Sequence, residues 1–446
     1  MAFMVRPDKT KCEELGCPEL AHIPVLYSSE WKLLIEPLDY LIARATGRWS
    51  YVGARSEYAS SKKLSENTMN AYGRDLENFF TFCEQYSLDW RTVSYDQLLE
   101  TYQTAMETGS YTAAGAALSA ATINRRMGTV GNYLDYAAHH GLRDEFEVVQ
   151  KLIPASIQNK MMGKTGRRTA NFSQRLGHVR QNPEDLRLPT GIEIQAWLER
   201  IKEHGKGNHG ITRYLMCRTI LDVGLRSAEV RLLRAEQIPD PNKLPVDQDN
   251  VMVTIMHGTK GDRKVGDPEY KGKPRRVKFK RDFLFFLHYY KRGARKAALE
   301  EFRKQNPGKP LPKQLFLSPS SGDYYAGRTL IDFWSQRGWA EADKNMPFKG
   351  WSPHLGRHAW ACYEVLHILQ KELDLIKIEE GLDDNYKPSF AKVQNLASTL
   401  IDMHIRPTMG HCSAETTEIY LRWLQGQVGK NEYARKWTAY LDGDDE

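Results

Sequence analysis

The stretch that decides the fold runs Met409-Gly-His-Cys-Ser-Ala-Glu-Thr-Thr-Glu-Ile-Tyr420. It places His411 nine residues before Tyr420. The histidine offers a hydrogen-bond donor, and the tyrosine offers a phenol whose reference pKa of about 10 keeps it protonated at neutral pH. Either residue alone is more often a packing residue, so the meaning of the pair depends on what else the chain carries.

Three further segments with chemically active side chains precede this stretch. They are Gly224-Leu-Arg-Ser-Ala-Glu229, Gly258-Thr-Lys-Gly261 and His354-Leu-Gly-Arg357. Each one alone is uninformative, because such short patterns occur by chance in most proteins. Together, and in this order, the segments supply two guanidinium groups, a lysine, two imidazoles and a phenol.

This set of side chains suits the cleavage of a phosphodiester without water or a metal ion. The reaction needs a nucleophile, cations that hold the charge developing on phosphorus, and a proton donor for the leaving oxygen. Arg226 and Arg357 can each present a bidentate fork to the non-bridging oxygens. Tyr420 can supply the attacking hydroxyl, and a histidine can accept its proton.

The four segments resemble the active site of the tyrosine recombinase (phage integrase) family in type, in order and in the nine-residue spacing of His411 and Tyr420. The resemblance implies a transesterification that forms a 3′-phosphotyrosine link and then rejoins strands without metal, ATP or another cofactor. In it His354 would accept the proton of the tyrosine, His411 would bind a phosphate oxygen, and Lys260 would protonate the leaving 5′ oxygen. The implied catalytic residues are Arg226, Lys260, His354, Arg357, His411 and Tyr420.

Two features depart from the family pattern. Arg357 and His411 are 54 residues apart, and the extra residues lie between Leu366 and Arg406. We expect a surface insertion there. The turn between the two expected strands is also long, running from 261 to 274, so that Lys264, Lys271 or Lys273 could reach the site in place of Lys260.

The segment around Arg226 also predicts the start of a helix. Ser227 is a favourable N-cap residue. Glu229 suits the positive end of the helix dipole and could support an active-site side chain.

Residues 57–145 predict an all-α domain, because apolar residues recur at helical spacing after Ser65, Ser94 and Thr122. Ser94 and Gln97 have the spacing of a capping box, and Gly141 suits a helix C-terminus. Through Thr68-Met-Asn-Ala-Tyr72 and Thr122-Ile-Asn-Arg-Arg126 this domain resembles the SAM-like core-binding domain of the family.

Residues 188–441 predict a mixed catalytic domain. Thr190 and Glu193 start a helix, strands are expected at 251–256 and 276–280, and helices at 211–223, 282–302, 327–343 and from 354 onward. The predicted fold class is therefore mainly α with a small antiparallel β-sheet, and the family resemblance implies that the two domains form a clamp on DNA. Residues 1–56 have no assigned role, although 30–45 could be a helix kinked at Pro37. Residues 146–187 form a basic linker with little periodicity, and 442–446 an acidic tail.

The positive charge of the chain is concentrated in two runs. The formal net charge is only +7, yet ten Lys or Arg face three acids over 259–281, and 151–182 holds seven Lys or Arg and no acid. Such runs suit a polyanionic partner. We expect contacts to double-stranded DNA core sites, on which the chain would assemble as a synaptic tetramer, from Asn124, Arg125, Arg126, Arg167, Arg168, Lys264, Lys273 and Arg275.

Length and composition exclude several other classes of protein. With 446 residues the chain predicts two or three domains, and 41% hydrophobic residues are enough for real cores. We find no apolar run long enough to span a membrane and no signal peptide, and expect a cytoplasmic protein, associated with the bacterial nucleoid when bound to DNA. Six cysteines are too few for a disulfide scaffold, and the single C-x4-C of Cys12 and Cys17 is a poor metal site.

Two other functions stay open on sequence grounds. A type IB topoisomerase-like enzyme uses the same kind of site to relax DNA by rejoining the same strand. A regulator of the same fold could bind DNA without catalysis, but it would have no need of a tyrosine nine residues after a histidine. A covalent protein–DNA adduct would exclude the regulator.

Overall fold

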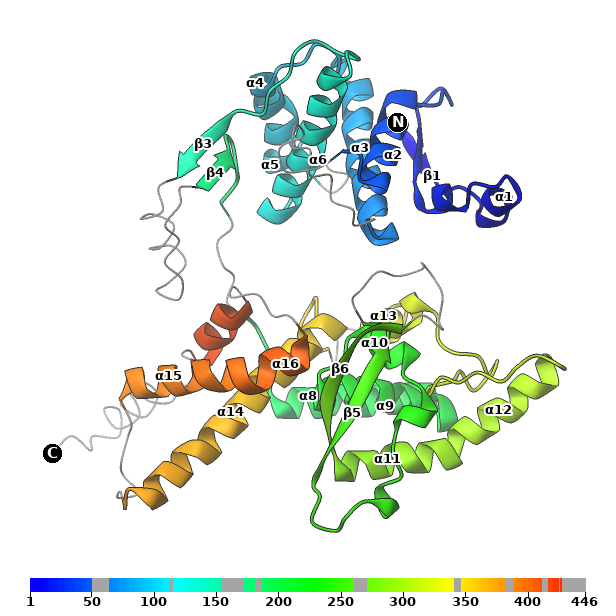
Figure 1. Ribbon diagram of the computed structural model, residues 1–446, viewed down its shortest axis with the longest axis vertical. Helices are drawn as coiled ribbons and strands as arrows, with labels where there is room; N and C mark the ends of the chain where they lie inside the picture. Colours follow the sequence, from blue (N-terminus) through cyan, green and yellow to red (C-terminus); the bar gives the residue numbers. More distant parts are fainter. Residues whose placement is uncertain are drawn as a thin grey trace. The chain divides into compact units, whose positions relative to one another are not determined.

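The computed structural model divides the chain into two compact units, Met1–Pro183 and Glu184–Glu446 (Figure 1). The structure describes residues 1–49, 64–111, 115–153, 172–180, 186–259, 271–340, 346–381, 389–410, 416–424 and 426. Each unit has a hydrophobic core of its own. The predicted fold class, mainly α with small antiparallel sheets, is confirmed.

The first unit is a helical domain flanked by two short hairpins. Its helices pack around one core, and each pair of strands is antiparallel. The elements are β1 (Phe3–Val5), α1 (Lys9–Glu14), the 3₁₀ helix η1 (Pro18–His22), β2 (Val25–Tyr27), α2 (Ile35–Thr46), α3 (Glu66–Tyr86), α4 (Tyr95–Leu98), the π-helical turn η2 (Leu99–Gln103), α5 (Thr104–Thr108), α6 (Ala120–His139), β3 (Gln150–Ile153) and β4 (Phe172–Arg175).

The main helices of this unit begin where the sequence predicts. The Ser65 hydroxyl caps α3 by accepting from the Thr68 amide, and Ser94 with Gln97 forms the predicted capping box of α4. Helix α6 starts slightly before Thr122, because Ser119 supplies its cap. It ends before Gly141, whose φ of 67° places it in the left-handed region that closes helices.

The first 49 residues add to the core of the first unit. Leu26, Tyr40 and Leu41 are fully buried in the same cluster as the side chains of α3 and α6. The ring of Tyr40 packs edge-on against Tyr133 with centroids 5.6 Å apart. The predicted kink at Pro37 is wrong, because α2 begins only at Ile35 and proline is tolerated in the first turn of a helix.

The basic segment after this core contains regular structure that its sequence does not predict. Strands β3 and β4 pair antiparallel, with Gln150 opposite Arg175. They are short and far apart in sequence, so neither gives a periodic signal of its own. Arg167 and Arg168 lie outside the described residues.

The second unit combines a helical body with one two-stranded sheet. A single large cluster of buried residues joins its helices to the sheet. The elements are α8 (Gly191–Gly205), α9 (Gly207–Val223), α10 (Ser227–Leu232), η3 (Ala235–Gln237), η4 (Pro241–Lys243), β5 (Asn250–His257), β6 (Lys271–Lys280), α11 (Arg281–Arg292), α12 (Ala294–Gln305), α13 (Gly327–Trp334), α14 (Pro353–Glu379), α15 (Phe390–Leu400), the π-helical turn η6 (Ile401–Ile405), α16 (Arg406–Met409) and the helical residues 416–424.

The predicted hairpin is present as β5 and β6, which pair antiparallel. Val251, Val253 and Ile255 are buried whereas Met252 is exposed, as the alternation of a half-buried strand requires. Two helix predictions are corrected. The helix expected at 282–302 is two helices divided at Gly293, and α13 stops at Trp334, short of 343.

The described parts of the inserted segment are helical and extend the body of the second unit. Helix α14, which is 27 residues long, continues into this segment as far as Glu379, and α15 leads from Phe390 to η6 and α16. A separate apolar cluster joins these helices to Tyr420 and Trp423. Leu375 and Ile378 near the end of α14 are exposed, in agreement with a surface insertion. Within the described parts of the chain, no helix is both long enough and apolar enough to cross a membrane.

Candidate active site

A tight turn between α9 and α10 places Arg226. Gly224 ends α9 with a φ of 72°, and a Cβ atom there would lie 2.3 Å from the Trp360 ring. The turn brings Arg226 to the N-cap position of α10. The predicted N-cap, Ser227, is wrong: it is the first helical residue, because the Glu229 carboxylate caps the Arg226 amide at 2.7 Å.

The carboxylate of Glu229 is the centre of a cluster of arginines. Its side chain is fully buried. Arg226 Nη1 donates to Oε1 at 2.8 Å, and Arg275 binds both oxygens through Nε at 3.0 Å and Nη2 at 2.5 Å. Arg357 Nη1 lies 3.8 Å from Oε2. Glu229 thus supports the Arg226 side chain, while the place of Arg226 in an active site stays a prediction.

The cluster carries more positive than negative charge. Burial alone would raise the pKa of Glu229, but the hydrogen bonds and charge of Arg275, with those of Arg226, hold it below its ordinary value. Burial, followed by the positive charges of Arg226 and Arg275, lowers the pKa of Arg357 to about 9. Three guanidinium groups around one carboxylate leave an excess of cation that an anion would balance.

Two of these arginines also hold the backbone that precedes His411. Arg226 Nη2 donates to the carbonyl oxygens of Met409 at 2.9 Å and Gly410 at 3.2 Å. Arg357 donates to the same Met409 carbonyl and to that of Gly224. These hydrogen bonds fix the backbone of Met409 and Gly410. His411, the next residue, lies outside the described residues.

The hydroxyl of Tyr420 contacts His358, a residue outside the predicted catalytic set. Tyr420 is fully buried, and its oxygen lies 2.9 Å from Nδ1 of His358. The other ring nitrogen of His358, Nε2, lies 3.1 Å from Nε2 of His354. His354 thus reaches Tyr420 through His358.

The environment of His358 keeps its ring neutral. Burial, together with the neighbouring His354 and Arg357, lowers its pKa to about 4. A neutral imidazole has one nitrogen that accepts and one that donates. The four-residue spacing of His354 and His358, one helical turn, was the signal in the sequence that could have pointed to this residue.

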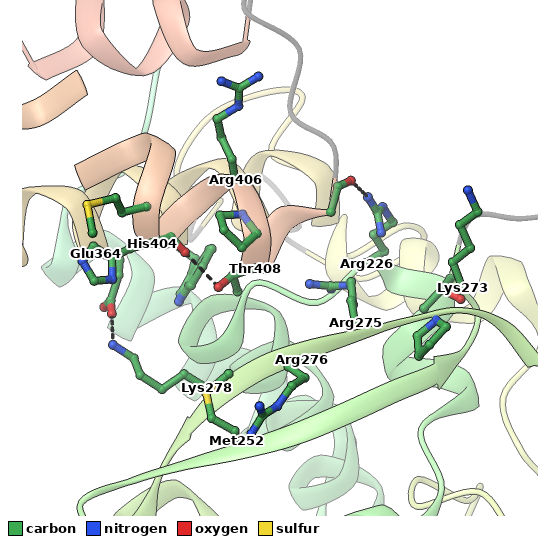
Figure 2. A pocket seen from close by; sticks show the side chains of 16 residues that line it. Arg226, Met252, Lys273, Arg275, Arg276, Lys278, Glu364, His404, Arg406 and Thr408 are labelled. Carbon is green, nitrogen blue, oxygen red and sulfur yellow. Dashed lines mark hydrogen bonds and ion pairs between the residues drawn. The ribbon is translucent and has the colours of Figure 1, made fainter. Parts of the chain in front are cut away.

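A basic cavity of about 690 Å³ lies beside the arginine cluster (Figure 2). In that view Arg226, Arg275 and Lys273 lie together on one side, and the ion pair of Lys278 with Glu364 lies on the other. The lining residues include Arg226, Thr259, Lys273, Arg275, Arg276, Lys278, Glu364, His404, Arg406 and Gly410. Its charge and polarity suit a phosphate group.

Of the predicted lysines, Lys273 lines this cavity. Lys260 and Lys264 lie outside the described residues. Thr259, which precedes Lys260 directly, lines the cavity, as does the exposed Lys273. Arg275 is instead largely buried in its pair with Glu229, with a side chain only 8% exposed. Its role in DNA binding stays a prediction.

The DNA-binding candidates of the first unit have partners within that unit. Asn124 donates to the Val179 carbonyl at 2.8 Å and accepts from Arg175 at 2.7 Å. Arg125 pairs with the buried Asp75 at 2.6 Å and is 46% exposed. Arg126 donates to an oxygen of Asn78 at 2.8 Å. These contacts hold α6 to its neighbours, and the DNA roles of Asn124, Arg125 and Arg126 stay predictions.

The helical part of the first unit matches a known domain family. Residues 56–141 match the model of the phage integrase N-terminal SAM-like domain. The match confirms the predicted resemblance for this segment. The segment lies in the first unit, ahead of the unit that carries Arg226 and Tyr420, which is the order that the resemblance implies.

Solved structures are similar to the chain over most of its length. A XerH site-specific recombinase bound to a palindromic difH substrate is 16% identical, covers 91% of this chain and 96% of its own, and has a TM-score of 0.49. The Tn1549 transposon integrase in complex with a circular intermediate DNA is 14% identical over 80% and 90%, with a TM-score of 0.42. XerA recombinase is 14% identical over 87% and 98%, with a TM-score of 0.31. No curated protein is significantly similar to the chain in sequence.

Proposed function

We propose that this chain is a site-specific DNA recombinase that cuts and rejoins strands through a covalent link to Tyr420. One observation carries the proposal. Arg226 and Arg357, which are far apart in sequence, both lie beside the buried Glu229 carboxylate and both donate to the Met409 carbonyl, and Tyr420 lies close enough to Arg357 for the two to interact electrostatically. The phage integrase SAM-like domain at 56–141 gives the same chain a domain of the matching family.

The proposed reaction begins with the scissile phosphate at the basic cavity. Arg226, whose side chain is 23% exposed, can bind a non-bridging oxygen, while the buried Arg357 adds positive charge behind it. The Tyr420 oxygen attacks phosphorus, the bond to the 5′ oxygen breaks, and a 3′-phosphotyrosine forms. Lys260 gives a proton to the leaving oxygen, and His411 binds a phosphate oxygen. The 5′-hydroxyl of a partner strand then reverses the step.

We further propose that the substrate is double-stranded DNA with paired core sites, on which four copies of the chain assemble. The basic run of β6 lies beside the cavity and supplies side chains for the backbone of the duplex. Such a protein acts where the DNA is, so we expect it in the cytoplasm, on the bacterial nucleoid when bound.

Covalent capture from a pool of random duplexes tests the proposal and selects the DNA site in the same experiment. Duplexes with a randomised core and a nick that traps the cleaved state are incubated with the chain, and the DNA that stays bound after denaturation is sequenced. We expect enriched sequences attached to Tyr420, and no adduct from Tyr420→Phe. A protein that binds DNA tightly but yields no adduct is the regulator instead. Relaxation of a supercoiled circle without exchange between two sites indicates the topoisomerase-like activity.

A further inference from the structure

Two imidazoles and a phenol form a continuous row in the second unit. Tyr420 Oη lies 2.9 Å from His358 Nδ1, and His358 Nε2 lies 3.1 Å from His354 Nε2. The two histidines are four residues apart on α14 and so share one face of that helix. The row runs from a fully buried hydroxyl to an exposed imidazole.

We propose that His358 takes the proton of Tyr420 directly and passes a proton on to His354. His358 is then a further catalytic residue, since it touches the reacting oxygen, and His354 is the end of a relay. The proposal rests on the proposed function, because it takes Tyr420 as the nucleophile. It names a residue that lies outside the set implied by the sequence.

The relay balances its protons as follows. Before attack, the hydroxyl of Tyr420 donates to Nδ1 of His358, Nε2–H of His358 donates to Nε2 of His354, and His354 carries its own proton on Nδ1. As the oxygen bonds to phosphorus, its O–H bond breaks and Nδ1–H forms on His358. At the same time Nε2–H of His358 breaks and Nε2–H of His354 forms. His358 ends neutral and His354 ends as an imidazolium.

The surroundings explain why two histidines serve better than one. His358 is partly buried, and it lies beside His354 and the cationic Arg357. Burial first, and then these two neighbours, hold its pKa far below the ordinary value of a histidine. A positive charge resting on its ring would therefore be costly. The relay leaves that charge on His354, whose exposed ring is solvated by water. The nucleophile loses its proton while the buried part of the row gains no charge.

Rates of adduct formation on the duplexes captured by the unaltered chain test the relay. His358→Asn keeps an acceptor near the position of Nδ1 but has no second nitrogen to pass a proton on. We expect it to slow adduct formation by roughly 10²- to 10⁴-fold, the usual range for a lost general base. His354→Asn should have a similar effect, and the double variant should be no slower than the slower single variant, because residues acting as one unit are not additive.

A matched control is available on the same helix. His367 is exposed on α14 and outside the row, so that His367→Gln should react within about twofold of the unaltered chain. If His358→Asn also stays within about threefold while His354→Asn loses its activity, His354 is the direct base and the relay is wrong. If the unaltered chain forms no adduct at Tyr420, the proposed function fails, which is a different result.

The tautomers of the two rings give a second test that needs no variant. Long-range ¹H–¹⁵N spectra of the full chain with ¹⁵N-labelled histidine distinguish protonation at Nδ1 from protonation at Nε2. We expect His358 to carry its proton on Nε2 and His354 on Nδ1 at neutral pH. A proton on Nδ1 of neutral His358 would make that nitrogen a donor, unable to accept the proton of Tyr420, and would overturn the proposal.

Discussion

At the scale of single residues, one carboxylate holds the arginines of the candidate active site together. Arg226, Arg275 and Arg357 would repel one another in a buried space without Glu229. The same carboxylate caps α10 through the Arg226 amide. Glu229 therefore links the start of α10 to the positions of the arginines that we propose to bind phosphate.

Replacing Glu229 by glutamine should destabilise the fold, because it leaves buried guanidinium groups without their counter-charge. We expect Glu229→Gln to lower the free energy of unfolding by about 3–5 kcal/mol in urea denaturation. Glu193→Gln is the matched control, since Glu193 caps α8 in the same way from an exposed position. It should cause a much smaller change, and equal losses in the two variants would contradict the role of the arginine cluster.

The stabilisation from Glu229 should depend on pH. Its folded pKa lies below the ordinary value of 4.5, so its charge stabilises the fold above about pH 4.5 and this contribution is lost as pH falls through the folded pKa. The difference in unfolding free energy between the unaltered chain and Glu229→Gln should be largest at neutral pH and shrink in acid. A difference that stays constant from pH 7 to pH 3 would show that Glu229 titrates alike in the folded and unfolded chain, and would contradict the lowered pKa.

Single residues were predictable where a fixed spacing carried the signal. Arg226, Arg357 and Tyr420 were named from short motifs, and the structure brings them together. His358 was missed because its function depends on a ring contact that only the folded chain creates. Arg275 looked like one more basic residue in a charged run, and nothing local in the sequence pairs it with Glu229, 46 residues away.

At the scale of the elements, the turn from α9 to α10 fixes where Arg226 can lie. Gly224→Ala would place a Cβ atom 2.3 Å from the Trp360 ring at a left-handed φ of 72°. We expect a loss of about 2–4 kcal/mol in unfolding free energy, from backbone strain and the displaced ring together, and slower adduct formation.

Gly141→Ala separates the two causes. Gly141 has a similar φ of 67°, but a Cβ atom there would meet no atom within 4 Å. It should lose only about 1 kcal/mol in the same measurement, from the left-handed backbone alone. Equal losses at the two sites would mean that contact with Trp360 contributes nothing.

The β5–β6 hairpin should supply the proton for the leaving oxygen. We expect Lys260→Ala to cut slowly on normal DNA and to regain most of its rate on a substrate with a 5′-phosphorothiolate, because a sulfur leaving group needs no proton. Lys273, on β6, lines the cavity, and the cleavage rate of Lys273→Ala should not be rescued by the phosphorothiolate substrate. If Lys273→Ala is rescued and Lys260→Ala is not, Lys273 is the residue that protonates the leaving oxygen.

Elements were predictable where their signal is local. Caps at Ser65, Ser94 and Thr190 and the alternation along β5 each depend on a few neighbouring residues. The pairing of β3 with β4 joins residues that are 19 to 25 positions apart, and so escaped prediction. The division at Gly293 was missed because the apolar pattern continues across it.

At the scale of the whole molecule, charge should govern the affinity for DNA more than any single contact. Two basic runs suit phosphate contacts, so binding should weaken steeply with salt. Neutralising Arg167 and Arg168 should reduce the slope of log affinity against log salt by about 2, for specific and unrelated duplexes alike. Neutralising Arg303 and Lys304, two exposed residues at the end of α12, is the control and should leave the slope unchanged. A loss confined to the specific site would contradict contacts to the backbone.

The wide separation of the candidate site residues along the chain determines the order in which they are synthesised. Arg226 holds the carbonyl of Met409, 183 residues later, and Tyr420 follows after that. Because chains emerge from the ribosome N-terminus first, the SAM-like domain and both arginines exist before the nucleophile has been made. On the proposed function, a nascent chain would therefore be able to bind DNA while it is still unable to cut it. The capacity to break a chromosome would arrive only when the segment that carries Tyr420 has been translated and folded.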